Sequence, residues 1–352
     1  MNPELHLVVP EGIEDPARPS GGNTYDLRLR DELRALGWSV RVRGVAGDWP
    51  WAGEVASRAL REALAAVPDG ARVLVDGLVG SVWPEVMVPA CRRLRIAVLM
   101  HMPVGARDGG SSLERERAVL GAVDAVVTTS EWTRGWLVRA YALDPARVHV
   151  AHPGVDAAEA ASGSAEGGNL LCVGAVTPGK GHDVLLAALV QVAELAWRCE
   201  CVGSLARAPE FVADLRRGIS TSGLDDRIVL TGPRSGRHLE ASYAGADLLV
   251  LASRGETYGM VVTEALARGL PVLAPMVGGV PEALGASPDG RRPGMLLPPG
   301  DAAALADGLR RWLSEPALRK GLRDAARGRR DDLPAWSDTA ERVAGVLTGV
   351  AS

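Results

Sequence analysis

The sequence has little of several residue types that mark particular classes of protein. Of its 352 residues only 4% are aromatic, four are cysteine, and two, Lys180 and Lys320, are lysine. The cysteines form no Cys-x-x-Cys pair, so buried thiols are expected rather than a zinc site. With a formal net charge of −4, the chain gives no reason to expect a nucleic acid as its partner.

Targeting signals and several catalytic signatures are also missing. No apolar run approaches the ~18–20 residues that a membrane span needs. The chain opens directly on a strand-like segment, Leu5–Val9, so no signal peptide is visible and a soluble, cytoplasmic protein is expected. The Asp-x-Asp signature of metal-dependent glycosyltransferases, the GxSxG elbow, the GxxxxGK[ST] loop and the HExxH motif do not occur. No metal site is predicted.

What the sequence does contain is a regular alternation of short apolar runs and helical segments. This alternation predicts parallel sheets with helices on both faces. In the first half the predicted strands are Leu5–Val9, Ser39–Val42, Arg72–Val75, Ile96–Met100, Ala125–Thr129 and Val148–Ala151, with helices at Asn23–Leu36, Val55–Val67 and Trp132–Tyr141.

The alternation stops at residues 156–168 (DAAEAASGSAEGG), whose small and polar residues indicate a linker. It then restarts. The predicted strands are Leu170–Val173, Cys199–Val202, Ile228–Leu230, Leu248–Leu251, Val272–Ala274 and Met295–Leu297, and helices follow at Ala302–Leu313, Pro316–Arg327 and Trp336–Leu347.

A chain of this length favours two domains over one. We therefore predict an α/β protein with two Rossmann-like domains that face each other across a cleft. Ligands of such folds lie at the carboxyl ends of the parallel strands, so the loops at those ends are the place to look for function.

The most informative loop is in residues 255–264 (GETYGMVVTE). A buried strand is predicted before it and a helix after it, over 259–268. Glu256 then lies in the loop at the carboxyl end of a strand, and Glu264 about one and a half turns into the helix. Two carboxylates in these places can bind the hydroxyls of a sugar nucleotide.

Between the two carboxylates the chain offers a site for an anion. The backbone N–H groups of Tyr258, Gly259 and Met260 form the N-terminus of the predicted helix, which suits a phosphate. The segment 173–182 (VGAVTPGKGH) offers a second anion ligand, because Lys180 stands between two glycines at a helix start in a chain that otherwise avoids lysine. We interpret Lys180 as a diphosphate ligand; a solvent-facing turn lysine is the alternative.

Four further segments of the first half lie at the ends of predicted strands or at the starts of helices. Gly21 and Gly22 allow the backbone to come close to a ligand, although the loop is not GxGxxG, which argues against a dehydrogenase. His101 ends an apolar strand before a proline turn and is expected to face the cleft. Ser130 or Glu131 caps the next helix. His152 lies where the chain crosses between the domains, as a hinge turn or a substrate contact.

Arginines gather early in the chain, at Arg28, Arg30, Arg34, Arg41 and Arg43. They are interpreted as a solvated helix face, and contact with an anionic acceptor or a membrane surface is the alternative.

Together these motifs resemble those of the retaining glycosyltransferases of family four, which have the two-domain GT-B fold. The resemblance covers nearly the whole chain and is carried by 255–272 (GETYGMVVTEALARGLPV), 173–186 (VGAVTPGKGHDVLL), 98–103 (VLMHMP), 126–133 (VVTTSEWT), 152–156 (HPGVD) and 277–284 (VGGVPEAL). It implies an N-terminal acceptor domain over 1–155, a C-terminal nucleotide-sugar domain over 168–334, and a last helix, 335–352, that crosses back to the first domain.

The resemblance also implies a role for each matching residue. Glu256 would contact hydroxyls of the donor sugar, Glu264 the nucleotide ribose, and His101 the sugar near its anomeric carbon. The base would rest against the loop 231–234. The residues implied in donor binding are Gly21, Gly22, Lys180, Thr257, Tyr258, Gly259, Met260, Val261 and Glu264, and the implied catalytic residues are His101, Glu256 and Lys180.

One position departs from the family's pattern. Members often carry an arginine after the Val-Gly of the second domain's first strand, and here that position is Ala175. Arg254 and Arg234 are the candidates to replace it. The predicted function is thus a retaining, metal-independent transfer of a hexosyl group from a UDP- or GDP-sugar to an unknown acceptor, with no cofactor. The alternatives are a nucleotide-sugar 2-epimerase or hydrolase, and a degenerate sugar-nucleotide-binding protein. The sequence does not determine the oligomeric state.

Overall fold

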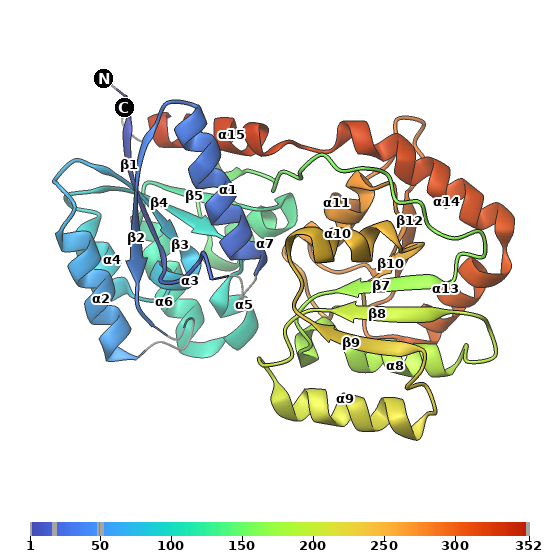
Figure 1. Ribbon diagram of the computed structural model, residues 1–352. Coiled ribbons are helices and arrows are strands. Elements are labelled where there is room, and N and C mark those ends of the chain that lie inside the picture. Colours follow the sequence, from blue (N-terminus) through green and yellow to red (C-terminus); the bar gives the residue numbers. More distant parts are fainter. Residues whose placement is uncertain (1, 16–19, 48, 50–52, 350–352) are drawn as a thin grey trace. The chain divides into compact units, whose positions relative to one another are not determined.

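The computed structural model describes residues 2–15, 20–47, 49 and 53–349. The chain divides into two compact units. Unit 1 comprises Met1–Gly154 and Pro334–Ser352, and unit 2 comprises Val155–Leu333. Each unit is an α/β structure built on one parallel sheet of six strands (Figure 1).

The sheet of unit 1 has the strand order β2-β1-β3-β4-β5-β6. Its strands are β1 (Glu4–Pro10), β2 (Ser39–Val45), β3 (Arg72–Asp76), β4 (Arg95–Met100), β5 (Ala125–Thr128) and β6 (Val148–Val150). The helices are α1 (Gly21–Ala35), α2 (Glu54–Ala65), α3 (Gly77–Gly80), α4 (Pro84–Ala90), α5 (Val104–Asp108), α6 (Gly110–Ala122), α7 (Glu131–Tyr141) and α15 (Trp336–Gly349).

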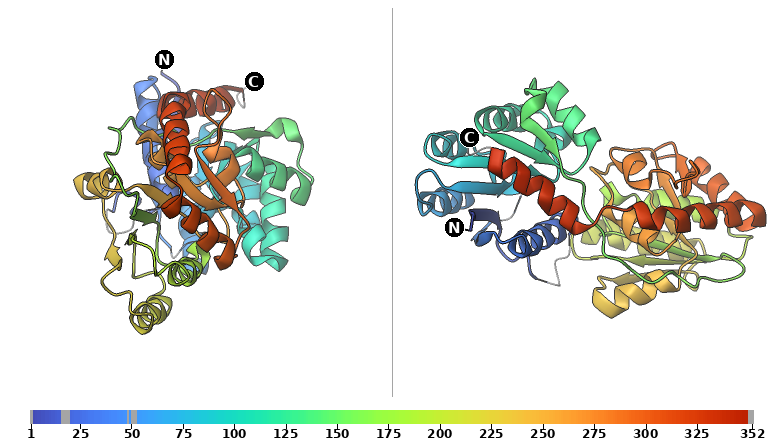
Figure 2. Two further views of the ribbon diagram at one scale, coloured as in Figure 1. Left: turned by 90° about the vertical axis from the view of Figure 1, so that its right-hand side faces the viewer. Right: turned by 90° about the horizontal axis from the view of Figure 1, so that it is seen from above.

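The core of unit 1 forms where alternate strand residues meet the helices. Val73, Val75, Ile96 and Val98 point to one face, because successive strand residues point to opposite faces, and they pack against apolar residues of α2, α4, α6 and α7. The last helix, α15, packs on α1, where the rings of Tyr25 and Trp336 meet edge to face at 5.5 Å. Figure 2 shows the two helices side by side in unit 1.

Unit 2 has the strand order β12-β11-β10-β7-β8-β9. Its strands are β7 (Asn169–Val173), β8 (Arg198–Val202), β9 (Ile228–Gly232), β10 (Leu248–Val250), β11 (Val272–Pro275) and β12 (Gly294–Leu297). The helices are α8 (His182–Val190), α9 (Pro209–Thr221), α10 (Gly236–Ala244), α11 (Met260–Ala267), α12 (Val280–Leu284), α13 (Ala302–Ser314) and α14 (Pro316–Arg329).

Helices cover both faces of this second sheet. Leu170, Leu248 and Val250 pack with α8, α9 and α13, whereas Leu171 and Leu249 pack with α10, α11 and α12. Strands buried on both faces are uniformly apolar, which is why they read as continuous Val and Leu runs in the sequence. Every strand predicted from those runs overlaps an observed strand.

The segment predicted as a linker contains no helix or strand but belongs to unit 2. The buried carboxylate of Asp247 accepts hydrogen bonds from the hydroxyl of Ser164 (2.7 Å) and the backbone N–H of Asn169 (2.9 Å). Trp312 donates its indole N–H to the carbonyl of Gly167 at 2.7 Å. Residues 161–169 are thus bonded to the rest of unit 2. The polar composition is that of a surface segment packed on this unit, and not that of a flexible linker.

Candidate active site

In unit 2 the predicted donor residues gather where the strand order reverses. The chain runs from β7 to β8 and β9 on one side, and β10, β11 and β12 lie on the other. Lys180 follows β7 and Glu256 follows β10, the two strands on either side of the reversal. Open α/β sheets bind ligands at the carboxyl ends of the strands at this topological switch point.

Lys180 and Glu256 are bonded to each other. Lys180 Nζ lies 2.6 Å from Glu256 Oε1, and the hydroxyl of Ser253 donates to the same oxygen at 2.7 Å. The other oxygen, Oε2, has no hydrogen bond to any residue that the structure describes. Glu256 is 11% exposed and Lys180 37% exposed, so both remain within reach of a ligand.

Close approaches between backbones hold the loop of Glu256 in place. A Cβ on Gly278, whose φ is +51°, would lie 1.6 Å from the carbonyl oxygen of Glu256, and one on Gly279 would lie 2.3 Å from that of Thr257. Only glycine fits such contacts. The VGGVPEAL segment is therefore a support for the loop that carries Glu256. Gly181 plays the same part for the lysine loop, since its Cβ would meet the carbonyl oxygen of Ala252 at 2.0 Å.

The helix after this loop begins as predicted. Gly259, with φ +95°, is the N-cap of α11, so the backbone N–H groups of Met260 and Val261 lie in the first turn, where no intrahelical acceptor exists. Such a terminus carries a partial positive charge that favours an anion.

Glu264, on α11, is held by a neighbouring tyrosine. The Tyr243 hydroxyl donates to Glu264 Oε2 at 2.7 Å, and Arg268 lies 4.4 Å from the centre of the tyrosine ring. Burial raises the pKa of Glu264, and the hydrogen bond from Tyr243 opposes that rise. One carboxylate oxygen is thus engaged, and Oε1 is the oxygen left to accept from a ligand.

Both arginines proposed to replace the family's missing arginine are engaged elsewhere. Arg254 forms a bidentate pair with Asp183, at 2.9 and 2.6 Å, and also donates to the Pro178 carbonyl. Arg234 pairs with Glu200 at 2.6 Å. Arg254 is therefore bonded to the backbone of the lysine loop, and Lys180 is the cation of this loop that contacts Glu256.

In unit 1 the predicted residue His101 directly follows β4, and its ring is fixed on three sides. Nε2 lies 2.9 Å from Asp26 Oδ1, the Tyr25 ring meets the imidazole edge to face at 5.1 Å, and a Cβ on Gly22 would lie 3.4 Å from the histidine Cδ2. The side chain is 16% exposed. His101 is thus partly open, and not enclosed in the core.

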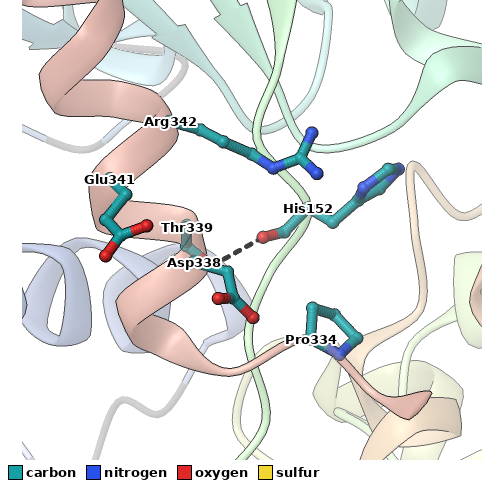
Figure 3. Close-up of a pocket in the computed structure, with 6 residues that line it drawn as sticks. All are labelled: His152, Pro334, Asp338, Thr339, Glu341 and Arg342. Atoms are coloured by element: carbon teal, nitrogen blue, oxygen red, sulfur yellow. Dashed lines mark hydrogen bonds between the residues drawn. The ribbon is translucent and has the colours of Figure 1, made fainter.

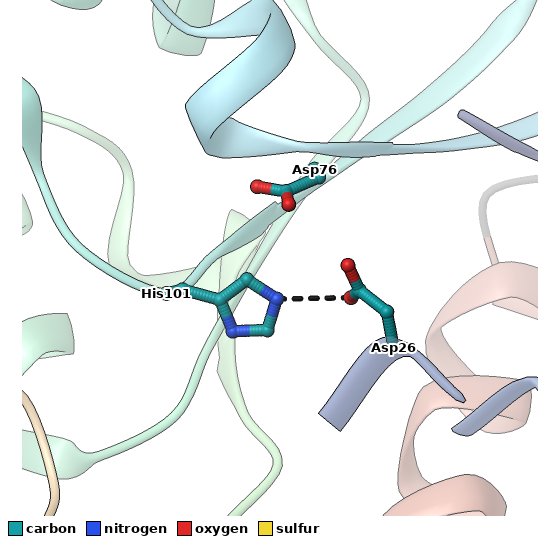
Figure 4. A group of neighbouring side chains, drawn as sticks. All are labelled: Asp26, Asp76 and His101. Atoms are coloured by element: carbon teal, nitrogen blue, oxygen red, sulfur yellow. Dashed lines mark hydrogen bonds and ion pairs between the residues drawn. The ribbon is translucent and has the colours of Figure 1, made fainter. Parts of the chain in front are cut away.

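A second buried acid, Asp76, completes a cluster around this histidine (Figure 4). Asp76 is the N-cap of α3 and accepts from the Leu78 N–H at 2.7 Å. Asp26, Asp76 and His101 each offer a ligand atom, and these atoms lie within 4.8 Å of one another. Among the described residues this is the group whose donor set could hold a metal ion.

The pKa values of two members of this cluster, Asp76 and His101, are raised. Burial, followed by the charge of Asp26, raises the pKa of Asp76 to about 7. For His101, burial acts to lower the pKa, but the Asp26 carboxylate outweighs it and the pKa rises to about 9. Shifted groups of this kind concentrate at functional sites.

Gly21 and Gly22 lie at the start of α1, next to His101. Ser20 is the N-cap of this helix and accepts from the Asn23 N–H at 3.1 Å. The preceding residues, 16–19, lie outside the described part of the chain. Ser130 caps α7 by accepting from the Thr133 N–H at 3.0 Å, as predicted.

A cavity of about 390 Å³ in unit 1 lies apart from these residues (Figure 3). It is lined by His152, Pro334, Asp338, Thr339, Glu341 and Arg342. The Thr339 hydroxyl donates to the carbonyl of His152 at 2.7 Å. The backbone of the HPGVD segment is therefore bonded to α15, and the His152 side chain is on the cavity wall.

Three of the arginines that gather early in the chain have partners nearby. Arg30 pairs with Glu14 and Asp31, Arg41 with Glu4, and Arg43 donates to His6. The early arginines are thus largely compensated by acids. Cys172, Cys199 and Cys201 are buried, as expected, whereas Cys91 is only partly buried. No helix among the described residues is long and apolar enough to cross a membrane.

Sequence reasoning named Lys180, Glu256, Glu264 and His101 as candidates but missed three residues that lie beside them. Asp26 lies in the buried stripe of α1, beside Tyr25 and Leu29, and an acid in such a stripe is itself a signal. Asp76 ends a strand, as His101 does, and the strand-end rule applies to it equally. Nothing in the sequence pattern singled out Tyr243.

Comparison with proteins of known structure defines the class. Sucrose-phosphate synthase from Thermosynechococcus elongatus matches over 99% of both chains with a TM-score of 0.79 and 22% identity. HepE from Anabaena, in complex with UDP-glucose, matches over 98% of this chain and 99% of its own with a TM-score of 0.78 and 16% identity. The fold is that of the GT-B glycosyltransferases.

Family models and curated relatives add the sequence evidence. Residues 167–315 match the model for glycosyl transferases group 1, and residues 82–159 match glycosyltransferase family 4. The D-inositol 3-phosphate glycosyltransferase of Kineococcus radiotolerans is 32% identical over 64% of this chain and 57% of its own. That of Saccharomonospora viridis is 34% identical over 60% of this chain and 52% of its own. The chain is thus similar to glycosyltransferases of group 1 and family 4, and it spans little more than half the length of the curated relatives it matches.

Proposed function

We propose that the protein is a retaining glycosyltransferase that moves a hexosyl group from a UDP- or GDP-sugar to an acceptor without a metal ion. The observation that carries this proposal is the meeting of Lys180, Glu256 and the N-terminus of α11 at the switch point of unit 2. A cation, a carboxylate and an anion-binding helix end are the groups that a sugar diphosphate requires.

Each group has a separate task in this proposal. Lys180 and the backbone N–H groups at the start of α11 stabilise the diphosphate as it leaves, each charge-assisted contact being worth roughly 1.5–3 kcal/mol. Glu256 accepts from a sugar hydroxyl through its open oxygen, Oε2. Glu264 accepts from the ribose through Oε1, while Tyr243 fixes the carboxylate. Catalysis then rests on positioning and on charge stabilisation rather than on a protein nucleophile.

The relatives guide the choice of substrates for a first assay. HepE was solved with UDP-glucose, and the curated relatives are named D-inositol 3-phosphate glycosyltransferases. UDP-glucose is therefore the first donor to test and D-inositol 3-phosphate the first acceptor, with GDP-sugars as the second donor series.

Two rival activities remain distinct from this proposal. A nucleotide-sugar 2-epimerase or hydrolase of the same fold would consume donor with no acceptor present. A degenerate binding protein would bind the nucleotide diphosphate but never turn the donor over. The retention of Lys180, Glu256, Glu264 and His101 favours an enzyme, and Ala175 is the one departure that favours the degenerate protein.

The test begins with a thermal-shift screen of the full chain against UDP, GDP and other nucleoside diphosphates. A ligand at about 100 times its dissociation constant adds ~2.7 kcal/mol of stability. Release of nucleoside diphosphate is then measured with the selected donor, with and without acceptor, and in EDTA. Acceptor-dependent, EDTA-insensitive release that retains the anomeric configuration supports the proposal. Release without acceptor indicates the hydrolase or epimerase, no release the binding protein, and loss of activity in EDTA contradicts the metal-free mechanism.

A further inference from the structure

The buried acids around His101 have no role in the function just proposed. Asp26 is fully buried on α1, and Asp76 is 3% exposed at the end of β3. Together with His101 they stand where the strand order of unit 1 reverses, since β1 is followed by β2 on one side and β3 lies on the other. The position is the counterpart, in this unit, of the place that Lys180 and Glu256 occupy in unit 2.

If Asp26 and Asp76 are both ionised, one buried oxygen of this cluster is left without a hydrogen-bond donor. Asp26 Oδ1 is bonded to His101 Nε2, but Asp26 Oδ2 is buried and has no donor among the residues that the structure describes. Asp76 lies within hydrogen-bonding reach of Asp26. In Figure 4 the second oxygen of Asp26 is on the Asp76 side. An unsatisfied buried carboxylate oxygen costs stability, and a proton on Asp76 would supply the missing donor.

We propose, on the basis of the function above, that Asp26 is the positioning residue for His101. One Asp26 oxygen accepts from Nε2–H of an imidazolium ring, and the other accepts from a protonated Asp76. Nδ1–H of His101 is then the donor that the ring presents to substrate. Figure 4 shows this second ring nitrogen on the side away from both carboxyls.

The balance of charge supports this arrangement. Two protons shared among the three groups give an imidazolium, one carboxylate and one neutral acid, with a net charge of zero. Two ionised acids beside a neutral histidine would instead bury two negative charges, which low-dielectric surroundings oppose. The ionisable groups that act on His101 are Asp26 from α1 and Asp76 from β3, and the shifts of both His101 and Asp76 go in the direction this arrangement requires.

A metal ion bound by Asp26, Asp76 and His101 is the alternative to protons shared among these three side chains. The direct hydrogen bond between His101 and Asp26 and the bond from the Leu78 N–H to Asp76 favour protons, because each already uses a lone pair or proton of a would-be ligand. The consequence for the reaction is specific. A histidine held as imidazolium at neutral pH stabilises negative charge and donates a hydrogen bond, but does not accept a proton as a general base.

The first experiment follows the protonation of His101 in the full-length protein labelled with ¹⁵N-histidine. The chain contains six histidines, and the signals of His101 are identified by their loss in His101→Asn. Both ring nitrogens should remain protonated at pH 7.5, where an ordinary histidine, with a pKa near ~6.5, is mostly neutral. Titration should occur only near pH 9. A neutral imidazole at pH 7.5 in the wild type overturns the proposal without recourse to any further variant.

The second experiment changes the acids one at a time. Asp26→Asn should make His101 neutral at pH 7.5, whereas Asp76→Asn should leave it charged, since the Asp26 carboxylate that accepts from Nε2–H remains in place. Asp31→Asn, an exposed position on the same helix, is the control. Equal protonation of His101 in wild type and Asp26→Asn contradicts the proposal. Zinc or manganese bound at one equivalent, and lost in Asp26→Asn, would identify the cluster as a metal site instead.

Activity gives a separate readout. Asp26→Asn should lower kcat by about 10²-fold, with the affinity for nucleoside diphosphate unchanged, and Asp26→Glu should restore part of the loss. Failure of the wild type to turn over any donor would count against the proposed function alone, because the NMR titration needs no substrate. A charged His101 together with unaltered kcat in Asp26→Asn would refute the positioning role while leaving the transferase intact.

Discussion

Lys180 Nζ and Glu256 Oε1 form an ion pair at 2.6 Å, although the two residues are 76 positions apart in the chain. The cation proposed for the diphosphate and the carboxylate proposed for the sugar thus neutralise each other before donor binds. A bound donor must therefore either contact both side chains while they remain paired or break the ion pair between them. Substitution of Lys180 should then report on the diphosphate of the donor, and substitution of Glu256 on its sugar.

Lys180→Ala removes the cation that is proposed to bind the diphosphate. We expect affinity for UDP or GDP to fall roughly 10- to 100-fold, the equivalent of one charge-assisted hydrogen bond, while affinity for the bare nucleoside changes little. Isothermal calorimetry measures both. Lys320→Ala is the matched control, because Lys320 is the other lysine of the chain and is 79% exposed. Equal losses for nucleotide and nucleoside would show that Lys180 shapes the loop instead.

Glu256→Gln breaks the same pair from the other side. Lys180 is then released toward the phosphates, so the affinity for nucleoside diphosphate should stay constant or rise slightly. Turnover should fall about 10²-fold or more, because the lost acceptor belongs to the sugar. Measuring Kd for the diphosphate and kcat for the donor separates the two effects. A large loss of diphosphate affinity would be incompatible with Glu256 acting on the sugar.

Glu264 should matter to binding more than to chemistry. Glu264→Gln should weaken free nucleotide and intact donor alike, by roughly 10-fold or more. Tyr243→Phe should have a smaller effect in the same direction, because it leaves the carboxylate in place but frees the oxygen that the hydroxyl holds. Glu315→Gln, at the exposed start of α14, serves as the control. Unchanged nucleotide affinity in Glu264→Gln would refute the ribose assignment.

His101→Ala should show the opposite pattern. Lys180, Glu264 and the start of α11, to which the proposed function assigns the nucleotide, belong to unit 2, whereas His101 belongs to unit 1. Turnover should therefore drop by about 10²-fold or more, and Kd for UDP or GDP should remain near its wild-type value. Steady-state kinetics and calorimetry on one preparation test both halves of this expectation. Wild-type turnover in the alanine variant would end the assignment.

Much of the fold follows from local pattern, because every buried parallel strand is a short apolar run. The observed helix α11 differs from the predicted segment 259–268 only at its ends, where Gly259 serves as the cap and Arg268 follows the last turn. The candidate donor residues were found for a similar reason, since Lys180 and Glu256 stand at strand ends in distinctive loops.

The partners of those residues could not be read from the same pattern. The bond from Tyr243 to Glu264 joins two helices, and the contact of Asp26 with His101 spans 75 residues. Such pairings depend on strand order and on helix rotation, which a linear pattern does not specify. The prediction of a linker at 156–168 failed for the same reason. The buried Asp247, whose carboxylate bonds this segment to unit 2, lies far away in the chain.

The raised pKa of Asp76 has a consequence for stability that can be measured without substrate. The value moves from an ordinary 3.8 to about 7 in the folded protein, through burial and then the charge of Asp26. The folded state therefore keeps a proton that the unfolded state releases between these two values. The resulting stabilisation is complete below the lower pKa and is lost as the pH rises to the upper one, with a slope of at most about 1.4 kcal/mol per pH unit.

Asp76→Asn removes this titration but keeps an amide oxygen to accept from the Leu78 N–H, so the cap of α3 survives. Relative to the wild type, the variant should become progressively more stable as the pH rises from 5 to 7, and the difference should level off above the upper pKa, since neither state then exchanges this proton. Urea unfolding of both proteins across this range gives the two curves. Parallel curves across this range would show that Asp76 is already ionised in the folded state, as it is in the unfolded state, and would contradict the raised pKa.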